Sequence, residues 1–494
     1  MWWLLAACGG PQCGAGTVET DGACVATADT VAEVTDDTEE TASGPGTGGT
    51  GGTRAGTVVD ADQDGYDASV DCDDDAPDIH PGADEVCDNG IDEDCDGVGA
   101  GCRWSGAVEL ESSDGALHTE YSGTIDRATW VEDLNGDGVQ ELAMGAHSEL
   151  VVYTGADGLI QSQDEALAVI PLPLFYPAPV VSGDIDGDGR PDLIAGHWRH
   201  DSRGIDQAGG ISVVTGDLVS GDVEIGVKMG TSEDEFLGKH LGLGDLTGDG
   251  WLDLVASSSD GLRLYAGPLS ADAPLTVTFE WPDGDGPFVI GDLNGDGVDD
   301  LVAIGNDEVY GLFGPLTTGG SLSTHEDFTL YEAPDDGYPT DLSLVGDVDG
   351  DGLQDLLVST AYSDEVCTNC GAIYLVNGPG YTGTLVAATA TIQGTIEFGD
   401  FGAFVTGLGD IDQDGFADFA VSSDSTPESY AQVHVFYGPL SGTAFATAAP
   451  FVVEDPRGEL YVHGGQDFTG DLVPDLFVQR NTEKIVHLFT GVGL

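Results

Sequence analysis

One acidic pattern recurs seven times along this chain and offers the chemistry of a cation site. In six copies it reads Asp-x-(Asp/Asn/Thr)-x-Asp-Gly-x-x-(Asp/Glu), and a short apolar run follows. The seven copies, which we name cassettes 1 to 7, begin at Asp133, Asp184, Asp245, Asp292, Asp347, Asp410 and Asp467. Alternating carboxylates in a tight loop suit Ca²⁺, because this hard cation takes six to eight oxygen ligands in a flexible geometry.

The ligand roles follow from position in the cassette. In cassette 2 the predicted ligands are the side chains of Asp184, Asp186, Asp188 and Asp192 and the backbone carbonyl of Arg190. Gly189 lies where the loop must turn sharply, which favours a residue free to take a positive φ. The same ligand roles fall to Asp133, Asn135, Asp137, Val139 and Glu141; to Asp245, Thr247, Asp249, Trp251 and Asp253; to Asp292, Asn294, Asp296, Val298 and Asp300; to Asp347, Asp349, Asp351, Leu353 and Asp355; and to Asp410, Asp412, Asp414, Phe416 and Asp418.

Calcium sites and empty acidic turns are the two interpretations of these loops. Crowded carboxylates repel one another unless a cation neutralises them, so repeated copies in one register favour calcium. Cassette 7 differs from the others: Thr469 offers only a hydroxyl, and Leu472 replaces the turn glycine, where a positive φ would be strained. We therefore expect about six propeller sites for Ca²⁺ and an empty or weakest loop at cassette 7.

The segments around each cassette predict short strands. Apolar runs such as Leu193–Ala195 and Leu356–Val358 follow the cassettes and are typical of strands buried on both faces. A second strand pattern ends in Gly-Pro, as at Gly267–Pro268, because proline cannot donate to a sheet. A third alternating segment, such as Leu275–Glu280 or Thr384–Ile392, and the strand before the cassette complete four strands per unit. Seven such units predict an all-β fold, a seven-bladed β-propeller.

The last unit needs an additional strand. After cassette 7 it has only Leu476–Val478 and Ile485–Phe489 as strand patterns. Ala107–Glu111 alternate suitably ahead of cassette 1. We expect this segment to supply the outer strand of the seventh blade and so close the ring.

The repeats resemble the FG-GAP repeats of integrin α-subunit propellers and of related bacterial surface proteins. Phe398-Gly399 and Phe401-Gly402, just before cassette 6, match the leading Phe-Gly of that repeat, and turns such as Ala266–Pro268 match its closing motif loosely. The resemblance covers residues 105 to 494 and implies Ca²⁺ in the loops that join the first two strands of each blade. It implies no single function, since such propellers serve adhesion and also accompany catalytic domains in lyases and phospholipases.

The charge of the chain restricts its partners and location. It has 90 Asp and Glu against 12 Lys and Arg, a formal net charge of −78. This argues against nucleic acid or an anionic membrane surface as partner. Numerous weak calcium sites suit the millimolar calcium outside the cytosol, so we expect a monomeric, extracytoplasmic protein at a bacterial cell surface or secreted from the cell.

The N-terminal segment predicts a lipid anchor. Leu5-Ala6-Ala7-Cys8 resembles a bacterial lipobox, in which a diacylglycerol is attached to the cysteine; an ordinary hydrophobic start is the alternative, since a basic region is missing. The expected order is signal and lipobox at 1–8, a short cysteine-containing segment at 9–27, a disordered linker at 28–58, a metal-binding module at 59–103 and the propeller at 104–494. With Cys8 lipidated, eight cysteines remain, which indicates disulfides in an oxidising compartment.

Residues 59–103 predict a small module held together by disulfides and metal. Asp60, Asp62, Asp64, Tyr66 and Asp71 follow the spacing of an EF-hand loop, with Tyr66 offering its carbonyl. The segment resembles a Cys/Asp-rich metal-binding motif of bacterial surface proteins and thrombospondin calcium repeats; an acidic spacer stapled by disulfides is the alternative.

The cysteines of this module and of the propeller differ in how far their pairing can be predicted. Cys72, Cys87, Cys95 and Cys102 allow three connectivities, and the sequence does not choose among them. Cys367 and Cys370 could form a redox or metal pair, but they have no second pair beside them. We expect them to staple a loop.

Two function classes stay open. The sequence has no Gly-x-Ser-x-Gly elbow and no His-Glu-x-x-His. The first class is a calcium-stabilised, surface-anchored binding or adhesion protein for an extracellular protein or glycan. The second is an extracellular polysaccharide lyase or hydrolase that uses acids on the propeller face. No catalytic domain accompanies the repeats in this sequence, which favours the first class.

The longest loops predict where a ligand binds. Units 2, 5 and 6 have extra residues between their second and third strands, hence on the face opposite the calcium loops. Aromatic residues and scarce basic residues on long loops are typical of recognition surfaces, although drift in tolerant loops is the alternative. The candidate ligand-binding residues are His197, Trp198, Arg199, His200, Arg203, Tyr362 and Tyr430.

Overall fold

The computed structural model describes most of the chain from residue 104 onward and short pieces before it. The described residues are 17–20, 23–26, 66, 70, 72–73, 76–77, 79–80, 104–113, 115–118, 125–146, 148–154, 166–174, 179–201, 204–217, 221–269, 275–281, 286–305, 307–331, 337–378, 383–385, 388–426, 429–456, 458–469, 473–480 and 485–490. The chain divides into two compact units, Met1–Thr57 and Val58–Leu494. In the first unit, β1 (Thr17–Thr20) and β2 (Ala23–Ala26) form an antiparallel hairpin.

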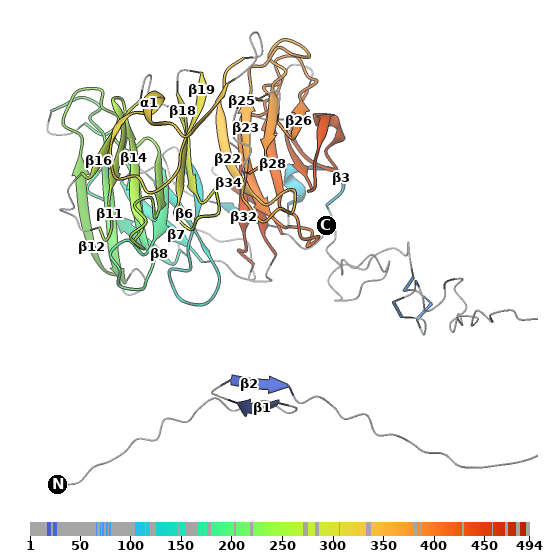
Figure 1. Ribbon diagram of the computed structural model, residues 1–494, viewed down its shortest axis with the longest axis horizontal. Helices are drawn as coiled ribbons and strands as arrows, with labels where there is room; N and C mark the ends of the chain where they lie inside the picture. The colour runs from blue at the N-terminus through green and yellow to red at the C-terminus, as the bar shows by residue number, and fades with distance from the viewer. Residues whose placement is uncertain are drawn as a thin grey trace, which may run out of the picture. The chain divides into compact units, whose positions relative to one another are not determined.

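Seven sheets in the second unit are the blades of a β-propeller (Figure 1). Blade 1 contains β5 (Ile125–Val131), β6 (Glu141–Ala146), β7 (Glu149–Tyr153) and β8 (Ala168–Pro171). Blade 2 contains β9 (Val180–Gly183), β10 (Asp192–Gly196), β11 (Gly210–Asp217) and β12 (Asp222–Met229). Blade 3 contains β13 (Leu241–Gly244), β14 (Asp253–Ser258), β15 (Gly261–Tyr265) and β16 (Val277–Glu280). These seven sheets confirm the predicted all-β, seven-bladed fold.

The other four blades follow the same order. Blade 4 contains β17 (Phe288–Gly291), β18 (Asp300–Gly305), β19 (Glu308–Leu312) and β21 (Phe328–Tyr331). Blade 5 contains β22 (Asp341–Gly346), β23 (Asp355–Thr360), β24 (Ala372–Val376) and β26 (Ala390–Gln393). Blade 6 contains β27 (Val405–Gly409), β28 (Asp418–Ser423), β29 (Ala431–Phe436) and β31 (Phe451–Asp455). Blade 7 contains β32 (Leu460–Gln466), β33 (Asp475–Arg480), β34 (Ile485–Phe489) and, from the N-terminal side, β4 (Gly115–His118).

The core lies between neighbouring blades. The second strands are buried along their whole length in blades 2 to 7, as their continuous apolar runs predict. Side chains of two adjacent blades form one cluster, as Ile194 and Ile211 of blade 2 do with Leu254 and Tyr265 of blade 3. Each blade is therefore stabilised by apolar contact with its neighbours, which makes an interrupted ring costly.

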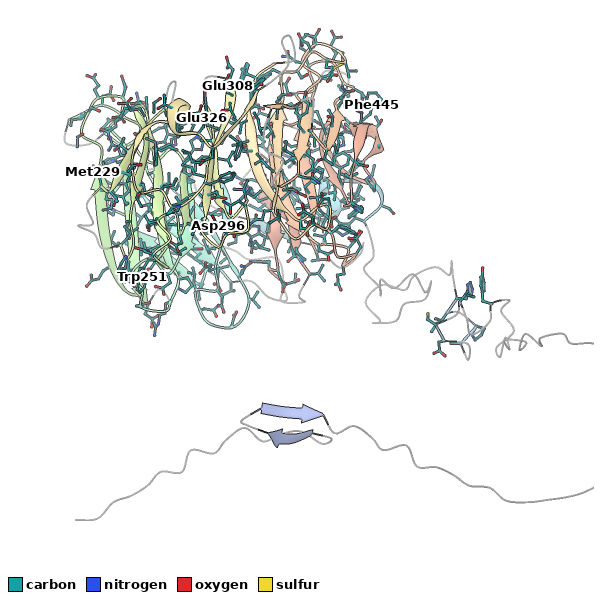
Figure 2. The ribbon with its side chains drawn as sticks, in the orientation of Figure 1. Met229, Trp251, Asp296, Glu308, Glu326 and Phe445 are labelled. Carbon is teal, nitrogen blue, oxygen red and sulfur yellow. A yellow bond between two sulfur atoms is a disulfide. The ribbon has the colours of Figure 1, made fainter. Side chains whose placement is uncertain are left out.

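Each cassette joins the first strand of a blade to the second. Gly183 at the end of β9 lies opposite Asp192 at the start of β10, and Gly291 lies opposite Asp300 in the same way. Because the strands are antiparallel, the turns between second and third strands lie at the other end of each blade. Figure 2 shows this separation, with Trp251 of cassette 3 at the lower end and Glu308 of the β18–β19 turn at the upper end. We name these two ends the cassette face and the opposite face.

Blades 3, 4 and 5 each carry a fifth strand that was not predicted. β20 (Gly320–Ser321), β25 (Gly383–Thr384) and β30 (Gly442–Phe445) each pair in parallel with the outer strand of the preceding blade. Single helical turns follow two of them, α1 (Leu322–His325) after β20 and η4 (Ala446–Ala448) after β30. The predicted single strand Thr384–Ile392 was therefore wrong, because its first part joins blade 4 and its second part is β26 of blade 5.

The N-terminal end of the propeller closes the ring, but with a different strand from the one predicted. β4 pairs antiparallel with β34 as the outer strand of blade 7. β3 (Gly106–Glu109), within the segment that we assigned to that place, pairs in parallel with β31 of blade 6 (Figure 1). The order β3, η1 (Leu110–Ser112), β4 repeats the order β30, η4, β31. The N-terminal segment therefore supplies the two strands that the seventh unit lacks at its C-terminal end. They are β3, which is the fifth strand of blade 6, and then β4, which is the outer strand of blade 7.

Trp104 fixes this closure in the core. Its side chain is 2% exposed and packs on Phe451 at a ring-centroid distance of 5.3 Å. Its indole N–H donates to the carbonyl of Thr490 at 3.1 Å, and the backbone carbonyl of Trp104 accepts the Tyr437 hydroxyl at 2.9 Å. The first residues of the ring therefore contact blade 6 and the end of blade 7.

Candidate metal centres and ligand-binding face

The cassette backbone is curled around its own carboxylates. In cassettes 1 to 6 the N–H of the sixth residue donates to the carboxylate of the first at N···O distances of 2.8–2.9 Å. The N–H of the seventh residue, whose carbonyl we predict as a ligand, donates to the carboxylate of the fifth at 2.9–3.0 Å. These bonds turn the carboxylates toward the inside of the loop, as the alternation of acids predicts.

Two positions of the cassette have a left-handed backbone. The sixth position is glycine with φ between +85° and +93° in cassettes 1 to 6, as expected for the sharp turn. The fourth position is left-handed too, from +72° to +82° at glycine in cassettes 1 to 5 and +59° at Gln413 in cassette 6. This second left-handed position was not predicted, although the glycine repeated there in cassettes 1 to 5 was a visible signal.

Four cassettes bring three carboxylates within 4.8 Å of one another among the described residues. They are Asp133, Asp137 and Glu141; Asp184, Asp186 and Asp192; Asp347, Asp349 and Asp351; and Asp410, Asp412 and Asp418. In two of them a buried carboxylate oxygen has no hydrogen-bond partner: Oδ1 of Asp192 and Oδ1 of Asp410. A buried oxygen without a donor is costly, and a cation held by the loop would satisfy it. The residues present therefore fit an oxygen-liganded metal ion.

The acid that closes each cassette is buried, which destabilises its ionised form. Burial, with neighbouring carboxylates adding to it, raises the pKa of Asp418 to about 8 and the pKa of Asp192 and Glu141 to about 7. Burial also raises the pKa of Asp300 and Asp355 to about 6. A divalent cation bound in the loop would reverse this cost by neutralising the acids.

The closing acid also ties the cassette to the rest of its blade. One oxygen accepts an N–H from the start of the cassette, as in Val348 to Asp355 at 2.9 Å. The other accepts the N–H of the glycine that ends the third strand; the four pairs are Gly267 with Asp253, Gly314 with Asp300, Gly378 with Asp355, and Gly438 with Asp418, at 2.8–3.1 Å. The Gly-Pro dipeptide therefore marks the end of a third strand, and its glycine is hydrogen-bonded directly to the closing acid of the cassette.

Cassette 7 and the module at 59–103 are described only in part. Asp475 accepts the N–H groups of Phe468 and Thr469, and the Thr469 hydroxyl is buried without a partner. Asp471 and Leu472 lie outside the described residues, as do Cys8, Asp60, Asp62, Asp64 and Asp71. Within the module, Tyr66 stacks on His80 at 4.9 Å, and Cys72 is in a disulfide.

The loop cysteines of the propeller pair with each other. Cys367 and Cys370 form a disulfide with a Cα–Cα distance of 5.3 Å. It staples the β23–β24 loop on the opposite face. This agrees with the loop staple predicted from their spacing.

The predicted ligand residues do not all reach the surface. His197 is fully buried, and its Nε2 lies 2.9 Å from the Ser212 hydroxyl, so its assignment to the ligand-binding surface was wrong. It was assigned there as part of the long loop of unit 2, but it directly follows β10, and its N–H donates to the carbonyl of Gly210 at 2.8 Å. Arg203 lies outside the described residues. His200 is half-buried, and burial lowers its pKa, which favours the neutral ring.

Trp198 and Arg199 form an organised cluster on the opposite face. The guanidinium carbon of Arg199 lies 4.1 Å from the Trp198 ring centroid, and Lys239 Nζ lies 5.9 Å from it. The ring of Phe236 lies near Trp198 as well, at a ring-centroid distance of 6.2 Å. Backbone bonds from Phe236 to Gln207 and from Leu237 to Ala208 fix the loop to the next blade. Tyr362 and Tyr430 are exposed on separate loops, in blades 5 and 6.

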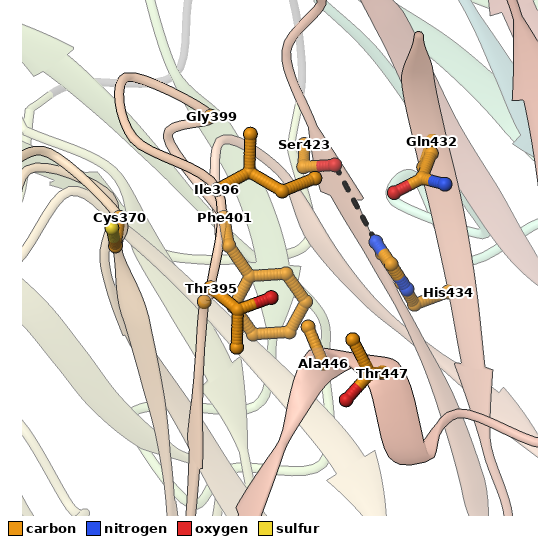
Figure 3. A pocket seen from close by; sticks show the side chains of 11 residues that line it. Cys370, Thr395, Ile396, Gly399, Phe401, Ser423, Gln432, His434, Ala446 and Thr447 are labelled. Atoms are coloured by element: carbon orange, nitrogen blue, oxygen red, sulfur yellow. Dashed lines mark hydrogen bonds between the residues drawn. The ribbon is translucent and has the colours of Figure 1, made fainter. Parts of the chain in front are cut away.

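A small pocket between blades 5 and 6 is not a ligand site (Figure 3). Its volume is about 30 Å³, which admits no more than a water molecule. His434 lines it, with Nε2 3.4 Å from the Ser423 hydroxyl, and burial lowers the pKa of His434 to about 4. This histidine is a neutral packing residue.

Two parts of the chain match known families. Residues 133–195 match the FG-GAP-like repeat, and residues 71–100 match the family Cu-binding MopE, described as "Putative metal-binding motif". Residues 133–195, from cassette 1 to β10, therefore carry an FG-GAP-like repeat. Ahead of cassette 6, the structure shows why Phe401 is followed by glycine: Phe401 is buried, and a Cβ on Gly402 would lie 3.0 Å from the Cβ of Ser359 in the preceding blade. The equivalent pair ahead of cassette 3 is Leu237-Gly238.

Integrin α chains are similar to part of this chain. Human integrin alpha-IIb is 32% identical over 143 residues, which cover 27% of this chain and 14% of the integrin. Drosophila melanogaster integrin alpha-PS2 is 34% identical over 158 residues, which cover 29% of this chain and 11% of the integrin. The chain thus matches a small part of these relatives' length. Among solved structures, BBS1N in complex with ARL6DN, soaked with lead, aligns with a TM-score of 0.46 at 14% identity, covering 75% of this chain and 93% of that one.

In the described part of the chain, no helix has the length and apolar character needed to cross a bilayer.

Proposed function

We propose that this protein is a calcium-stabilised binding protein of the extracytoplasmic space that captures a protein or glycan on its opposite face. The crowded, buried acids of the cassettes support calcium as structural cement. The similarity to integrin α chains supports a binding role. Cys8 would carry the lipid that holds the protein at the cell surface, with the segment 9–103 as the connection to the propeller.

The Trp198 cluster is the observation that carries this proposal. In a chain with 12 basic residues, Arg199 and Lys239 converge on one indole ring. The β10–β11 loop, which presents Trp198 and Arg199, is hydrogen-bonded to the segment ahead of β13 that presents Lys239, so little ordering entropy would be lost when a ligand binds. Arg and Trp on a fixed loop are typical of residues that dominate binding energy.

Ligand capture tests the proposal. The calcium-loaded chain is screened on a glycan array and in pull-downs from the surroundings of the producing cell. Exchange of Trp198 and Arg199 for alanine should abolish capture and leave the melting temperature unchanged. Phe445→Ala removes an aromatic side chain that is 47% exposed on β30 and should have no effect. Capture that survives the double exchange would place the ligand elsewhere.

The same screen separates the alternative function. If the protein is a polysaccharide lyase or hydrolase, bound polysaccharides will be shortened, and EDTA will alter the rate. A binding protein returns them intact. For the anchor, Cys8→Ser should move the protein from the membrane fraction to the soluble fraction.

A further inference from the structure

The outer edge of blade 2 differs from the outer edges of blades 3 to 6. In those four blades a further strand, β20, β25, β30 or β3, pairs in parallel with the outer strand and covers its edge. Among the described residues, β12 of blade 2 pairs with β11 alone. The described sheets of blades 1 and 7 also end in an open outer strand, but β8 and β4 have four residues each, whereas β12 has eight. In the described part of the propeller, β12 is therefore the longest open edge, and it lies at the outside of the ring (Figure 1).

The hydrogen-bonding groups at this edge belong to alternate residues of β12. Just beyond β12, Gly230 donates its N–H to the carbonyl of Gly209 on the β11 side at 3.1 Å. The carbonyl of Gly210, opposite Met229, is directed instead toward β10, where it accepts the N–H of His197. Bonded and non-bonded pairs alternate along an antiparallel ladder, so the even-numbered residues of β12 bond to β11. The residues that direct their N–H and C=O groups to the open edge are Val223, Ile225, Val227 and Met229.

The side chains of β12 form an apolar face and a charged face. The odd-numbered side chains are apolar and face blade 1, where Val223 packs against the core; Ile225 is 36% exposed. The even-numbered side chains face blade 3, where Lys228 Nζ lies 4.8 Å from the centroid of the Tyr265 ring. Glu224, on the same face, is exposed and lines a groove of about 480 Å³. The edge thus has a carboxylate and one of the 12 basic residues of the chain on one side, four positions apart.

These charges are complementary to those of a second copy of the same strand. If two copies of β12 pair antiparallel, even-numbered residues must lie opposite even-numbered residues, because bonded pairs alternate with non-bonded ones. With Gly226 opposite Gly226 of the second copy, Glu224 of each copy lies opposite Lys228 of the other. These are non-bonded pairs, in which opposite side chains approach most closely. A shift of two residues in either direction would place Glu224 or Lys228 opposite glycine.

The same register also pairs the apolar face. Ile225 lies opposite Val227, and Val223 lies opposite Met229. Glycine at the centre of a strand marks a place where another backbone approaches closely, and Gly226 has this position on the two-fold axis. The net charge of −78 on each copy opposes association, but physiological salt screens charges beyond a Debye length of about 8 Å. The contacts along the strand are closer than that and are screened less.

We propose that β12 is a dimerisation edge, at which two copies of the chain pair their blade 2 sheets antiparallel about Gly226. Each copy would then cover the edge of the other, as β20, β25, β30 and β3 cover the edges of blades 3 to 6 within one chain. A monomer was expected from the sequence, because an open edge becomes visible only when the blades are assembled. If the Trp198 cluster captures a ligand as proposed above, the antiparallel pairing directs the two clusters in opposite directions, and the dimer bridges two ligands.

Analytical ultracentrifugation of the full, calcium-loaded chain at physiological salt tests this proposal. Cys8→Ser removes the proposed lipid and its thiol, so that neither joins chains by itself. The mass should rise with protein concentration from the 50.8 kDa of one chain to twice that value. A mass that stays at 50.8 kDa would overturn the proposal. If a captured protein then slows the hydrogen exchange of the Ile225 and Val227 amides, the edge accepts a strand of that protein instead.

Charge reversals assign the dimer to this edge and register. Glu224→Lys places lysines opposite each other at both pairs, and Lys228→Glu places acids there, so each variant should dimerise about tenfold more weakly. A mixture of the two variants should dimerise as tightly as the parent chain, since every lysine then lies opposite an acid. Recovery in the mixture also shows that both variants are folded.

A matched control separates this effect from general surface charge. Glu280→Lys makes the same charge change on β16, whose edge is covered by β20, and should leave dimerisation unchanged. An equal loss in Glu280→Lys, or a mixture of the two β12 variants that stays as weak as each variant alone, would reject the edge.

A cross-link tests the position of the two-fold axis. Gly226→Cys should form a disulfide between two copies under mild oxidation, because Cβ atoms opposite each other in a non-bonded pair lie about 4.5–5.5 Å apart, close to disulfide geometry. Glu224→Cys should cross-link only when it is mixed with Lys228→Cys. Cross-linking of Glu224→Cys with itself and not of Gly226→Cys would overturn the register.

Discussion

Calcium binding to the propeller should release protons. Without a cation, the acids that close the cassettes are buried beside other carboxylates, which raises the pKa of several of them into the physiological range. A bound Ca²⁺ requires these acids to be ionised, so each proton they carry must leave when the ion enters. The number released can be worked out from the individual pKa values.

At pH 7 the metal-free propeller should carry about two such protons. Glu141 and Asp192, with pKa values of about 7, are about half protonated. Asp418, with a pKa of about 8, is about nine-tenths protonated, whereas Asp300 and Asp355, with pKa values of about 6, are about one-tenth protonated. Filling all these sites should therefore release about two protons per chain, and about half of that should come from cassette 6.

Titration of the metal-free chain with calcium in buffers of different ionisation enthalpy measures this number. The apparent enthalpy should depend on the buffer with a slope of about two protons at pH 7, falling toward zero at pH 9. Asp418→Asn should lower the slope by about one, and Glu365→Gln should not change it. Calcium binding with an enthalpy that is the same in every buffer would refute the reasoning.

Three further predictions concern stability. Chelation of calcium by EDTA should lower the melting temperature of residues 104–494, because calcium binds the folded loops and not the unfolded chain. The metal-free form should become more stable as the pH falls from about 8 to about 6. The reason is that the pKa values of the closing acids in the folded chain lie above those in the unfolded chain. An unmoved melting curve would contradict both statements. Deletion of 104–118 should expose the edges of β31 and β34 and cause aggregation on gel filtration, whereas a stable truncated chain would argue against the closure described above. Arg480→Ala should cost about 3–5 kcal/mol in urea unfolding, because it removes one partner of the buried ion pair with Asp455. Arg190→Ala, which breaks an exposed pair with Asp217, should cost no more than about 1 kcal/mol.

The repeated elements could be predicted from the sequence because each one obeys a local rule. The cassette acids, the turn glycine and the apolar second strand are close together in the chain, and their periodicity shows in a single unit. The loop staple at Cys367–Cys370 was predictable for the same reason. The seven copies of the cassette then predicted the number of blades.

Features that depend on two units at once could not be predicted in this way. β20 and β25 have two residues each, and they exist only because the outer strand of the preceding blade is beside them. Ala107–Glu111 alternate as an outer strand would, yet the outer strand of blade 7 is β4. The burial of His197 and the ion pair of Arg480 with Asp455 likewise depend on contacts between distant segments.

The closure by β3 and β4 also determines how the propeller would respond to tension. If the protein is held through its N-terminal segment, as we propose, a pull from a captured ligand is transmitted to the anchor through Trp104 and β3. The load then falls first on the hydrogen bonds from β3 to β31 and from β4 to β34, and on the contact of Trp104 with Phe451. The joint that completes the ring would also be the joint that bears the force, so the strongest pull the protein withstands would be set by blades 6 and 7.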